Sequence, residues 1–360
     1  MSNNIKILIA GCGNMGTSHA LAYQNMGNVS ICGLVSRGDS KFVLREKLGI
    51  EVELFDDFEE ALEKTCPDAV CISTYPDTHD AFAIKAFEKN CHVFMEKPIA
   101  DTLRGAINVV EAAGRSGKKL VIGYILRHHP SWMKFVELSH NLGKPLVMRM
   151  NLNQQSNGHM WTVHKNLMKS LSPIVDCGVH YIDVMCQMTR SEPLKVHAIG
   201  ARLTEEIPDG NYNYGQLQIT FRDGSVGWYE AGWGPMISET AFFVKDVIGP
   251  KGSISIVAAN AASTGNSDSV EHHTKAESLR WHHAAVDKAN HFIKPDEWID
   301  LHDEPGHQEL CNREQRFFIE AIYNDTDLTD HMADAVNSLK IALACDESIR
   351  NGKTVDLDNF

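Results

Sequence analysis

The chain has 360 residues, of which 43% are hydrophobic and 22% are charged, and its formal net charge is −13. This length predicts about two domains, and the composition is typical of a globular protein rather than a disordered, collagen-like or coiled-coil chain. Such an acidic chain offers no general field to attract nucleic acid or an anionic membrane, and no uncharged apolar run approaches the roughly 18 residues of a membrane span. We therefore expect no nucleic acid and no membrane as partner, and local donors must hold any anionic ligand.

The N-terminus and the cysteines both favour a cytoplasmic protein. The first four residues lead directly into an apolar segment, without the charged-then-apolar layout of a signal peptide. The nine cysteines contain no C-x-x-C pair, and an odd number cannot pair completely within one chain. We expect buried, reduced thiols; a zinc site or structural disulfides are the alternatives.

The first third of the chain alternates apolar strand patterns with helix patterns. This alternation predicts an α/β Rossmann domain, in which a doubly wound parallel sheet carries helices on both faces. The predicted strands cover residues 5–10, 29–35, 68–73, 93–95 and 120–124. The predicted helices cover residues 14–26, 40–48, 78–90 and 103–116.

The pattern changes after about residue 126, where several strands follow one another with turn signals between them. This predicts an α+β domain with a large open, mostly antiparallel sheet. We place the Rossmann dinucleotide-binding domain at residues 1–125 and a domain for substrate binding and oligomerisation at residues 126–360. The second domain's predicted strands cover residues 147–153, 196–203, 214–221, 226–233, 242–248 and 253–257. Its predicted helices cover residues 131–142, 173–188, 308–323 and 332–350, with a loop at 259–268.

A G-x-G-x-x-G motif follows the first predicted strand and opens the first helix, as a dinucleotide site requires. Gly11 allows the tight turn, Gly13 lets a pyrophosphate approach the backbone, and Gly16 lets helix and strand pack closely. Asn14 and Met15 begin the helix, whose N-terminus supplies free N–H donors and partial positive charge. The motif predicts dinucleotide binding; a glycine-rich turn without a ligand is the alternative.

The end of the second predicted strand bears on the choice of cofactor. Ser36 stands twenty residues beyond Gly16, where an NAD site usually has an acidic residue for the ribose 2′-hydroxyl. Ser36 and Arg37 instead suit the 2′-phosphate of NADP, because a carboxylate would repel that phosphate. We favour NADP over NAD, although Asp39 lies nearby, and a solvated surface charge is the alternative role of Arg37.

Polar residues follow two later strands at the carboxyl ends, where open α/β sheets bind ligands. A polar turn follows the strand at 68–73, and Glu96-Lys97-Pro98 follows the strand at 93–95. The bond before Pro98 is a candidate for the cis form, which only X–Pro bonds adopt at low cost. The residues of these segments that we expect at the cofactor are Ser73, Thr74, Tyr75, Asp77, His79, Glu96 and Lys97.

A further polar pattern lies on the helix predicted at 173–188. Asp176, His180 and Asp183 are separated by four and three residues, which places them on one helix face. Ser172 is a candidate cap for this helix, with Pro173 at its first position. We expect this helix face to present ionisable side chains to a substrate.

In this order, the motifs resemble those of the glucose–fructose oxidoreductase / inositol dehydrogenase / rhizopine-catabolism (Gfo/Idh/MocA) family. The resemblance implies a two-domain enzyme that moves a hydride between a nicotinamide and a carbon of a sugar, sugar derivative or cyclitol. It also implies that Lys97 hydrogen-bonds the reacting oxygen, that His180 gives or takes the proton, and that Asp176 orients the substrate hydroxyl. The residues that carry the resemblance are 11–16, 74–79, 96–98, 123–127, 176–183 and the last helix.

The chemistry of alcohol oxidation supports these roles independently. The reaction removes a hydride, which a nicotinamide accepts, and a proton, which needs a base such as His180 with a pKa near the working pH. The oxygen gains partial negative charge, which a fixed ammonium such as that of Lys97 stabilises. A solvated lysine and a structural helix histidine are the alternatives, and for Asp183 a structural role is favoured over a functional one.

We expect no metal, because hydride transfer assisted by a lysine needs none. Asp176, His180 and Asp183 can be interpreted as metal ligands, but we reject that interpretation for this reason. A histidine group in a polar segment also suggests zinc, but no cysteine or acidic ligand stands at a matching spacing, and a solvated or interface surface is favoured. These histidines are His272, His273, His282, His283 and His291.

Substrate contacts beyond the helix are expected from residues after the last Rossmann strand, Tyr124, Arg127 and His128, and from Trp161. In many relatives that the chain resembles, a Trp-Arg pair stands at Trp161 and helps to close over the cofactor. Here Thr162 follows the tryptophan, which predicts a different pocket. Trp233 could line that pocket or belong to the core.

Two other functions remain open for this fold. A non-catalytic dinucleotide-binding regulator would tend to lose the lysine–histidine pair, which this chain keeps, and an NAD-recycling glycosidase would release no reduced cofactor. We also expect a homodimer or homotetramer. A sheet face with Tyr214, Trp228 and Tyr229 would be an exposed apolar surface in a monomer.

Overall fold

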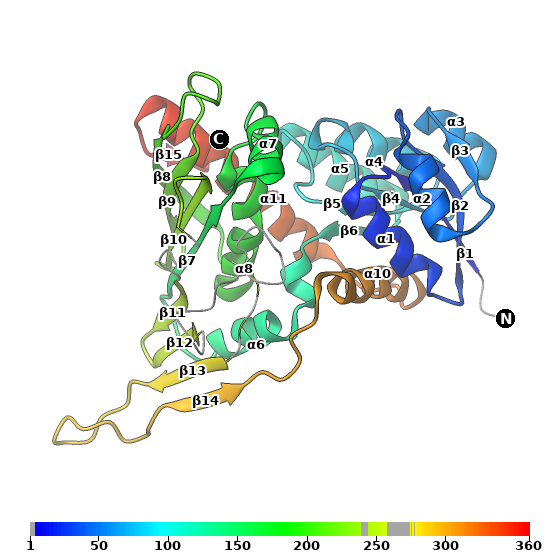
Figure 1. Ribbon diagram of the computed structural model, residues 1–360. Helices are drawn as coiled ribbons and strands as arrows, with labels where there is room; N and C mark the ends of the chain where they lie inside the picture. The colour runs from blue at the N-terminus through cyan, green and yellow to red at the C-terminus, as the bar shows by residue number, and fades with distance from the viewer. Residues whose placement is uncertain (1–3, 239–243, 258–273, 275, 277) are drawn as a thin grey trace. The chain divides into compact units, whose positions relative to one another are not determined.

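The computed structural model describes residues 4–238, 244–257, 274, 276 and 278–360 (Figure 1). The described chain forms two compact units. The first unit holds the residues up to Ile125 and His307–Val336, and the second holds Leu126–Gly306 and Asn337–Phe360. The predicted loop at 259–268, two residues of the predicted strand at 242–248, and His272 and His273 lie outside the described residues.

A parallel sheet of six strands forms the centre of the first unit. Its strands are β1 (Ile5–Ala10), β2 (Val29–Val35), β3 (Glu53–Phe55), β4 (Ala69–Ile72), β5 (His92–Glu96) and β6 (Leu120–Gly123). They lie in the order β3-β2-β1-β4-β5-β6, with every neighbouring pair parallel. This is the predicted Rossmann sheet. The chain reverses its direction across the sheet between β1 and β4, so the carboxyl ends of these strands form the crevice where such sheets bind ligands.

Helices connect the strands of the first unit. They are α1 (Asn14–Gln24), α2 (Ser40–Leu48), α3 (Phe58–Thr65), η1 (Pro76–Thr78), α4 (His79–Glu88) and α5 (Leu103–Ser116). The strand β3 and the helix α3 are missing from the sequence prediction. Three residues are too few to show a strand period, and α3 is a short helix that begins after Asp57, whose side chain accepts a hydrogen bond from the N–H of Glu60.

A helix from late in the chain completes the core of the first unit. The helix α10 (His307–Tyr323) contributes Phe318 and Ile319 to the apolar cluster that contains β1 and α1. Its Gln308 also donates a hydrogen bond from Nε2 to the carbonyl of Ser18 at 2.8 Å. Residues 307–336, which the sequence analysis assigned to the second domain, therefore pack with the first unit. The division between the units falls within α11 (Thr329–Asn351).

A mixed sheet of nine strands dominates the second unit. The strands are β7 (Val147–Gln155), β8 (Pro193–Ala201), β9 (Tyr214–Phe221), β10 (Val226–Gly234), β11 (Lys245–Gly249), β12 (Gly252–Val257), β13 (Ser278–His283), β14 (Glu297–Asp300) and β15 (Val355–Asp356). Their order is β14-β13-β12-β11-β7-β10-β9-β8-β15. Most neighbours are antiparallel as predicted, but β7 and β10 are parallel, so the sheet is not a simple meander. The long connection from β7 to β10, which contains α7, η3 and α8 as well as β8 and β9, allows this parallel pairing.

Helices cover one face of this sheet. They are α6 (Pro130–Ser139), α7 (Gly158–Leu167), the π-helical turn η3 (Ile174–Gly178) and α8 (Val179–Thr189), each of which contacts β10 or β12. The short helix η2 (Ile125–His128) precedes α6 in the chain. Tyr229 of β10 lies on the covered face, fully buried, and stacks on Tyr181 of α8 with ring centroids 5.1 Å apart. The expectation that Tyr229 lies on the open face is therefore wrong, because strand residues alternate between faces. Tyr214 and Trp228 lie on the opposite face of the sheet from Tyr229 and are partly exposed.

Two general expectations concern the helices and the cysteines. Among the described residues, none of the helices is both long and apolar enough to cross a lipid bilayer. All nine cysteines lie in the described part of the chain, and none of them forms a disulfide bond. Burial raises the pKa of the Cys12 thiol to about 12 and that of Cys91 to about 11, so these two thiols are un-ionised at neutral pH.

Candidate active site

The glycine motif of the first unit forms a tight turn between β1 and α1. Gly11 has φ of +95°, and a Cβ there would lie 2.3 Å from the carbonyl oxygen of Ser73 at the end of β4. A Cβ on Gly16 would lie 1.9 Å from the carbonyl oxygen of Gly11. Only glycine fits at either position, since both contacts are with backbone atoms that cannot rotate away.

Gly13 differs from the other two glycines because a Cβ on it would meet no atom within 4 Å. It is the N-cap of α1, and the first turn of that helix contains no acidic residue. The first N–H groups of a helix have no partner within the helix, and they carry partial positive charge. The space beside Gly13 and the donors of Asn14 and Met15 therefore fit the pyrophosphate of a dinucleotide.

The end of β2 presents Ser36 and Arg37 next to this turn in the sheet. The Ser36 hydroxyl shares a hydrogen bond of 2.7 Å with the hydroxyl of Ser40, and the Arg37 side chain is exposed. Lys41 holds the backbone here, because its buried ammonium donates to the carbonyl oxygens of Ser36 and Gly38 and to the carboxylate of Asp56. Lys41 therefore fixes the loop that a ribose would meet, a role that the sequence analysis missed because an exposed lysine has the same pattern.

The turn after β4 contains exposed residues and is followed by a buried histidine. Tyr75 is 74% exposed and Asp77 is exposed, while Thr74 and Thr78 join their hydroxyls at 2.7 Å. His79 is fully buried. Its Nδ1 lies 2.8 Å from the carbonyl oxygen of Pro98 and its Nε2 lies 3.1 Å from that of Thr74. Its ring thus ties this turn to the loop after β5, and burial lowers the pKa of His79.

The loop after β5 carries Lys97 and Glu96 in different surroundings. The Lys97–Pro98 peptide bond is cis, as the sequence analysis suggested. The Lys97 side chain is half-buried, whereas Glu96 is 8% exposed and directs its carboxylate into the unit. The carboxylate lies 2.7 Å from Nε2 of His19 and accepts the backbone N–H of Lys97 at 3.3 Å. Glu96, buried in the first unit, therefore holds the backbone of Lys97 through this hydrogen bond.

In the second unit, Asp176 lies within the π-helical turn η3, and His180 lies in the first turn of α8. Both are half-buried. The Ser172 hydroxyl accepts the N–H of Val175 at 3.1 Å, which is the predicted cap. Gly178 allows this segment to approach β10, because a Cβ there would lie 2.8 Å from the ring of Tyr229. π turns are frequent at functional sites.

Asp183 and Arg127 form a buried ion pair. Asp183 is fully buried and accepts two hydrogen bonds from Arg127 and one, at 2.9 Å, from Nε2 of Gln187. This placement agrees with the structural role favoured for Asp183. The pair also occupies Arg127, which was expected at the substrate. His128, beside it, has its pKa lowered to about 4 by burial and then by the charge of Arg127.

Asp176 has neighbours that the sequence analysis missed. His164 on α7 is buried, and burial lowers its pKa to about 4 although the charge of Asp176 opposes this shift. Its ring stacks on that of Trp233, with centroids 4.3 Å apart. Trp233 is fully buried and donates from Nε1 to Gln154 at 2.7 Å. Trp233 is therefore a core residue, and His164 presents a neutral imidazole near the Asp176 carboxylate.

Two further residues expected at the substrate lie in apolar surroundings. Tyr124 is fully buried, with its ring against His331 at a centroid distance of 6.3 Å. Trp161 is 7% exposed, belongs to an apolar cluster with Met168 and Ile207, and donates from Nε1 to Glu206 at 3.3 Å. Burial of these rings leaves them little surface for a ligand, because each already contacts side chains of its own unit.

The described histidines of the polar segment lie at or near the hairpin of β13 and β14. His282 contacts the carboxylate of Asp296 at 2.8 Å, and His283 contacts that of Glu297 at 2.5 Å. Each of these two histidines is thus paired with a carboxylate. His291 is largely exposed, with its ring 3.8 Å from the carboxylate of Asp287.

Comparison with protein-family models gives two matches. A model described as an oxidoreductase family with an NAD-binding Rossmann fold matches residues 5–124. A model described as the GFO/IDH/MocA C-terminal domain matches residues 136–255. Together the two matches cover two thirds of the chain.

Individual relatives agree with these models. The chain is 26% identical to a scyllo-inositol 2-dehydrogenase (NAD(+)) of Bacillus subtilis over 99% of this chain and 98% of that protein. It is 25% identical to a myo-inositol 2-dehydrogenase of Thermotoga maritima over 62% of this chain and 67% of that protein. A crystal structure of scyllo-inositol dehydrogenase from Lactobacillus casei with NAD(H) and scyllo-inositol has a similar fold, with a TM-score of 0.77 and 21% identity over 99% of both chains.

Proposed function

The chain belongs to the Gfo/Idh/MocA family of oxidoreductases, and from this premise we propose that it transfers a hydride between a nicotinamide cofactor and a secondary alcohol or ketone of a cyclitol or sugar. The observation that carries the proposal is the open N-terminus of α1 beside Gly13, at the switch point of the Rossmann sheet. Lys97 follows β5 at the same carboxyl edge of that sheet. A dinucleotide bound in that crevice would lie along the edge that carries Lys97.

The proposed roles follow from the charge and pKa that each group brings. The bound nicotinamide supplies or accepts the hydride. The Lys97 ammonium stabilises the negative charge that gathers on the substrate oxygen. His180 takes or returns the hydroxyl proton, and Asp176 orients the hydroxyl by accepting a hydrogen bond from it. His164, close to Asp176 and neutral, supports that carboxylate without competing for the substrate proton.

A cyclitol is the substrate class that we propose first. The two relatives from Bacillus subtilis and Thermotoga maritima are named inositol 2-dehydrogenases, and their names support this class for the present chain. Arg127 is occupied by Asp183, so we assign it the role of holding α8 and its His180 in place. Trp161 and Tyr124 are assigned to the support of the site for the same reason, because both are buried.

We also propose that the cofactor is NADP rather than NAD. Ser36 stands where NAD sites usually have a carboxylate, and Arg37 offers an exposed guanidinium to a 2′-phosphate. The relative from Bacillus subtilis is named for NAD(+), so a direct comparison of the two cofactors is the deciding measurement. The lack of disulfide bonds among the nine described cysteines supports a reducing compartment, the cytoplasm, as the place of action.

A homodimer or homotetramer is proposed from the face of the nine-stranded sheet that the helices leave open. Val147, Val226 and Ile248 pair across β10, β7 and β11 on that face, and each is 38% exposed. Ile199 on β8 is 58% exposed. A second copy of the chain would cover these apolar side chains.

The proposal is tested with a panel of inositols and sugars, each assayed with NAD+ and with NADP+. Accumulation of reduced nicotinamide during steady turnover is expected with at least one cyclitol. Cofactor binding without turnover on any member of the panel would favour a regulatory protein instead. Cleavage of a glycoside without accumulation of reduced nicotinamide would favour a glycosidase.

A further inference from the structure

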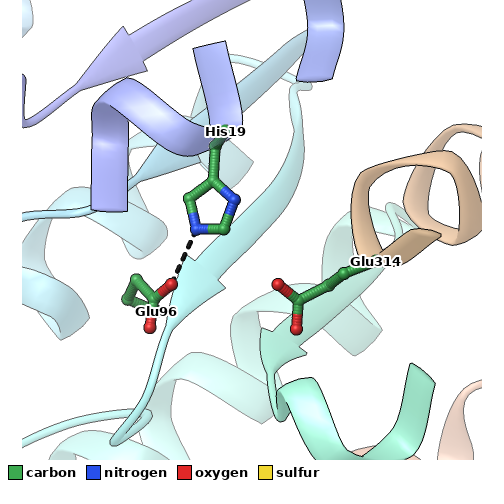
Figure 2. A group of neighbouring side chains, drawn as sticks. All are labelled: His19, Glu96 and Glu314. Carbon is green, nitrogen blue, oxygen red and sulfur yellow. Dashed lines mark hydrogen bonds and ion pairs between the residues drawn. The ribbon is translucent and has the colours of Figure 1, made fainter. Parts of the chain in front are cut away.

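Three titratable side chains meet inside the first unit, at the end of β5 (Figure 2). They are His19 on α1, Glu96 at the end of β5 and Glu314 on α10, and we call them the buried triad. One nitrogen or oxygen atom from each lies within 4.8 Å of those of the other two. Figure 2 shows the Glu314 carboxyl group directed towards the His19–Glu96 pair. All three residues are buried, with Glu96 the most exposed at 8%.

A chain of hydrogen bonds determines the state of His19. The Tyr23 hydroxyl donates to Oε1 of Gln315, and Nε2 of Gln315 donates to Nδ1 of His19 at 2.9 Å. Because Nδ1 accepts, the single hydrogen of a neutral imidazole lies on Nε2. His19 therefore donates from Nε2 to Oε1 of Glu96 at 2.7 Å.

Glu96 is the member of the buried triad that is suited to hold the negative charge. One of its oxygens receives the hydrogen of His19, and the other receives the backbone N–H of Lys97 at 3.3 Å. Donors directed at both oxygens favour the ionised form of a carboxyl group. The charge of Glu96 is thus fixed directly beside the backbone of Lys97.

The surroundings of the Glu314 carboxyl group, unlike those of Glu96, disfavour a negative charge. Its Oε1 is buried and has no hydrogen-bond partner, and the group is 1% exposed. Burial, followed by the charge of Glu96, raises the pKa of Glu314 well above its usual value. The other titratable groups that face it are Tyr23, Cys71 and Cys311, and burial raises the pKa of each of them as well. These three are neutral at physiological pH and bring no positive charge to Glu314.

We propose that Glu314 is a protonated carboxylic acid in the native protein, beside the ionised carboxylate of Glu96, and that it is a positioning residue for Lys97 because it leaves Glu96 as the one charged member of the buried triad. Two buried carboxylates whose oxygens lie within 4.8 Å of each other repel one another strongly, and protonation of Glu314 removes that repulsion. The hydrogen comes from solvent when the chain folds, since an exposed glutamate is ionised at neutral pH. The part of the proposal that concerns Lys97 rests on the proposed function; the protonation does not.

The first test measures stability against pH in the wild type and in Glu314→Gln, whose amide keeps the shape and carries no ionisable proton. A raised pKa in the folded state gives stability that is complete below the unfolded pKa and is lost as pH rises towards the folded pKa. Above about pH 5.5, and as long as the pH stays below the raised pKa of Glu314 in the folded state, the folding equilibrium of the wild type should therefore fall relative to that of the variant by about tenfold per pH unit.

The matched control is Glu309→Gln on the same helix. Glu309 is partly exposed and its pKa is lowered by its hydrogen bonds to Asn312 and Arg313, so this variant should show no such slope in that range. The two variants are compared in parallel urea titrations. A pH-independent difference between the wild type and Glu314→Gln would overturn the proposal.

A second test detects the proton directly. The infrared difference spectrum, wild type minus Glu314→Gln, should contain the carbonyl band of a protonated carboxylic acid at neutral pH, and the spectrum for Glu309→Gln should not. Absence of that band would overturn the proposal. So would one equivalent of a divalent metal in the purified protein that is lost in Glu314→Gln, because a metal would require both carboxylates to be ionised.

The positioning role is tested by kinetics. Glu314→Leu places an apolar side chain in place of the polar group beside the charge of Glu96 and should lower kcat about 10- to 100-fold with an unchanged Kd for the cofactor, whereas Glu314→Gln should recover most of that loss. Equal kcat in Glu314→Leu and the wild type would overturn this role. If the wild type shows no dehydrogenase activity at all, the proposed function fails, but the stability and infrared results still decide the state of Glu314.

Discussion

The guanidinium of Arg127 donates two hydrogen bonds to the carboxylate of Asp183, from Nε at 2.8 Å and from Nη2 at 2.5 Å. The two groups are 56 residues apart in the chain, and the Arg127 side chain is only 14% exposed. Two parallel hydrogen bonds fix both distance and orientation. The pair therefore anchors the segment after β6 to the helix that carries His180.

Removal of one partner from this buried pair should be costly. Asp183→Asn leaves a buried guanidinium without its counter-charge, and we expect the free energy of unfolding to fall by about 3–5 kcal/mol. The pair of Arg149 and Asp246, in which the arginine side chain is 48% exposed, is the control, since Arg149→Ala should cost only about 0–1 kcal/mol. Denaturant titrations of both variants measure these changes. A loss below that of the control would show that the pair does not anchor α8.

Lys97 and His180 are expected to act on the reaction rather than on stability. Lys97→Ala and His180→Ala should each lower kcat by about 10²–10⁴-fold, because each removes a group that meets charge or a proton in the transition state. The thermal midpoint should stay close to that of the wild type. Lys89→Ala and His140→Ala, at exposed positions of the same two units, serve as controls. Unchanged turnover in either test variant would contradict its assigned role.

Ser36 and Arg37 should decide the choice of cofactor. Arg37→Ala should weaken NADP by about 10- to 100-fold and leave NAD almost unchanged, since a charge-assisted hydrogen bond to the phosphate is lost. Ser36→Asp should shift the preference towards NAD, because the carboxylate repels the 2′-phosphate and accepts from the ribose hydroxyl. Fluorescence titration with both reduced cofactors measures the two dissociation constants of the wild type and of each variant, with Lys47→Ala on the following helix as control. Equal effects on both cofactors would contradict the NADP preference.

Gly13 and Gly16 form a matched pair for separating cofactor binding from folding. Gly13→Ala adds a methyl group to open space at φ of −77°, so the thermal midpoint should be unchanged while cofactor affinity falls about 10-fold or more. Gly16→Ala places a Cβ against the backbone oxygen of Gly11, and should destabilise the protein by about 1–3 kcal/mol or more. Full cofactor affinity in Gly13→Ala would remove the main support for the proposed site.

The open face of the nine-stranded sheet should be an interface between copies of the chain. Ile199→Lys and Val226→Lys place charges on that face and should lower the mass measured by light scattering to that of a monomer. Leu203→Lys changes a side chain that is 49% exposed but lies outside the strands, and it should leave the mass unchanged. A wild type that is already monomeric would contradict the prediction.

The sequence predicts elements well where one local pattern dominates. The bounds of β1, β2, α2 and α5 agree with the prediction, since a largely apolar run or a helical pattern between turn residues defines each. The helix α7 is missed, as are β13 and β14, because their side chains are mixed in polarity and partly exposed. The placement of α10 in the first unit is also missed, because nothing local reports which core will receive Phe318.

In the candidate site, too, features set by nearby residues are predictable from the sequence, whereas contacts with distant parts of the chain are not. The glycine turn is predictable because each glycine answers a constraint within a few residues or one neighbouring strand. The partners of Arg127 and Glu96 are not, since Asp183 and Glu314 come from distant parts of the chain. The burial of His79 and Trp161 is likewise a property of packing, which residue type alone does not report.

Because of the π-helical turn at Ile174–Gly178, the direction of the Asp176 side chain about the helix axis can change independently of that of His180. A π turn holds an additional residue compared with an α turn, so removal of one residue there can restore a regular helix without disturbing α8. Such a deletion would rotate Asp176 by about 100° about the axis while His180 keeps its orientation. If Asp176 and His180 have the proposed roles, evolution and protein engineers thus have a route to new substrates through a shift of helical phase, with no exchange of these two side chains.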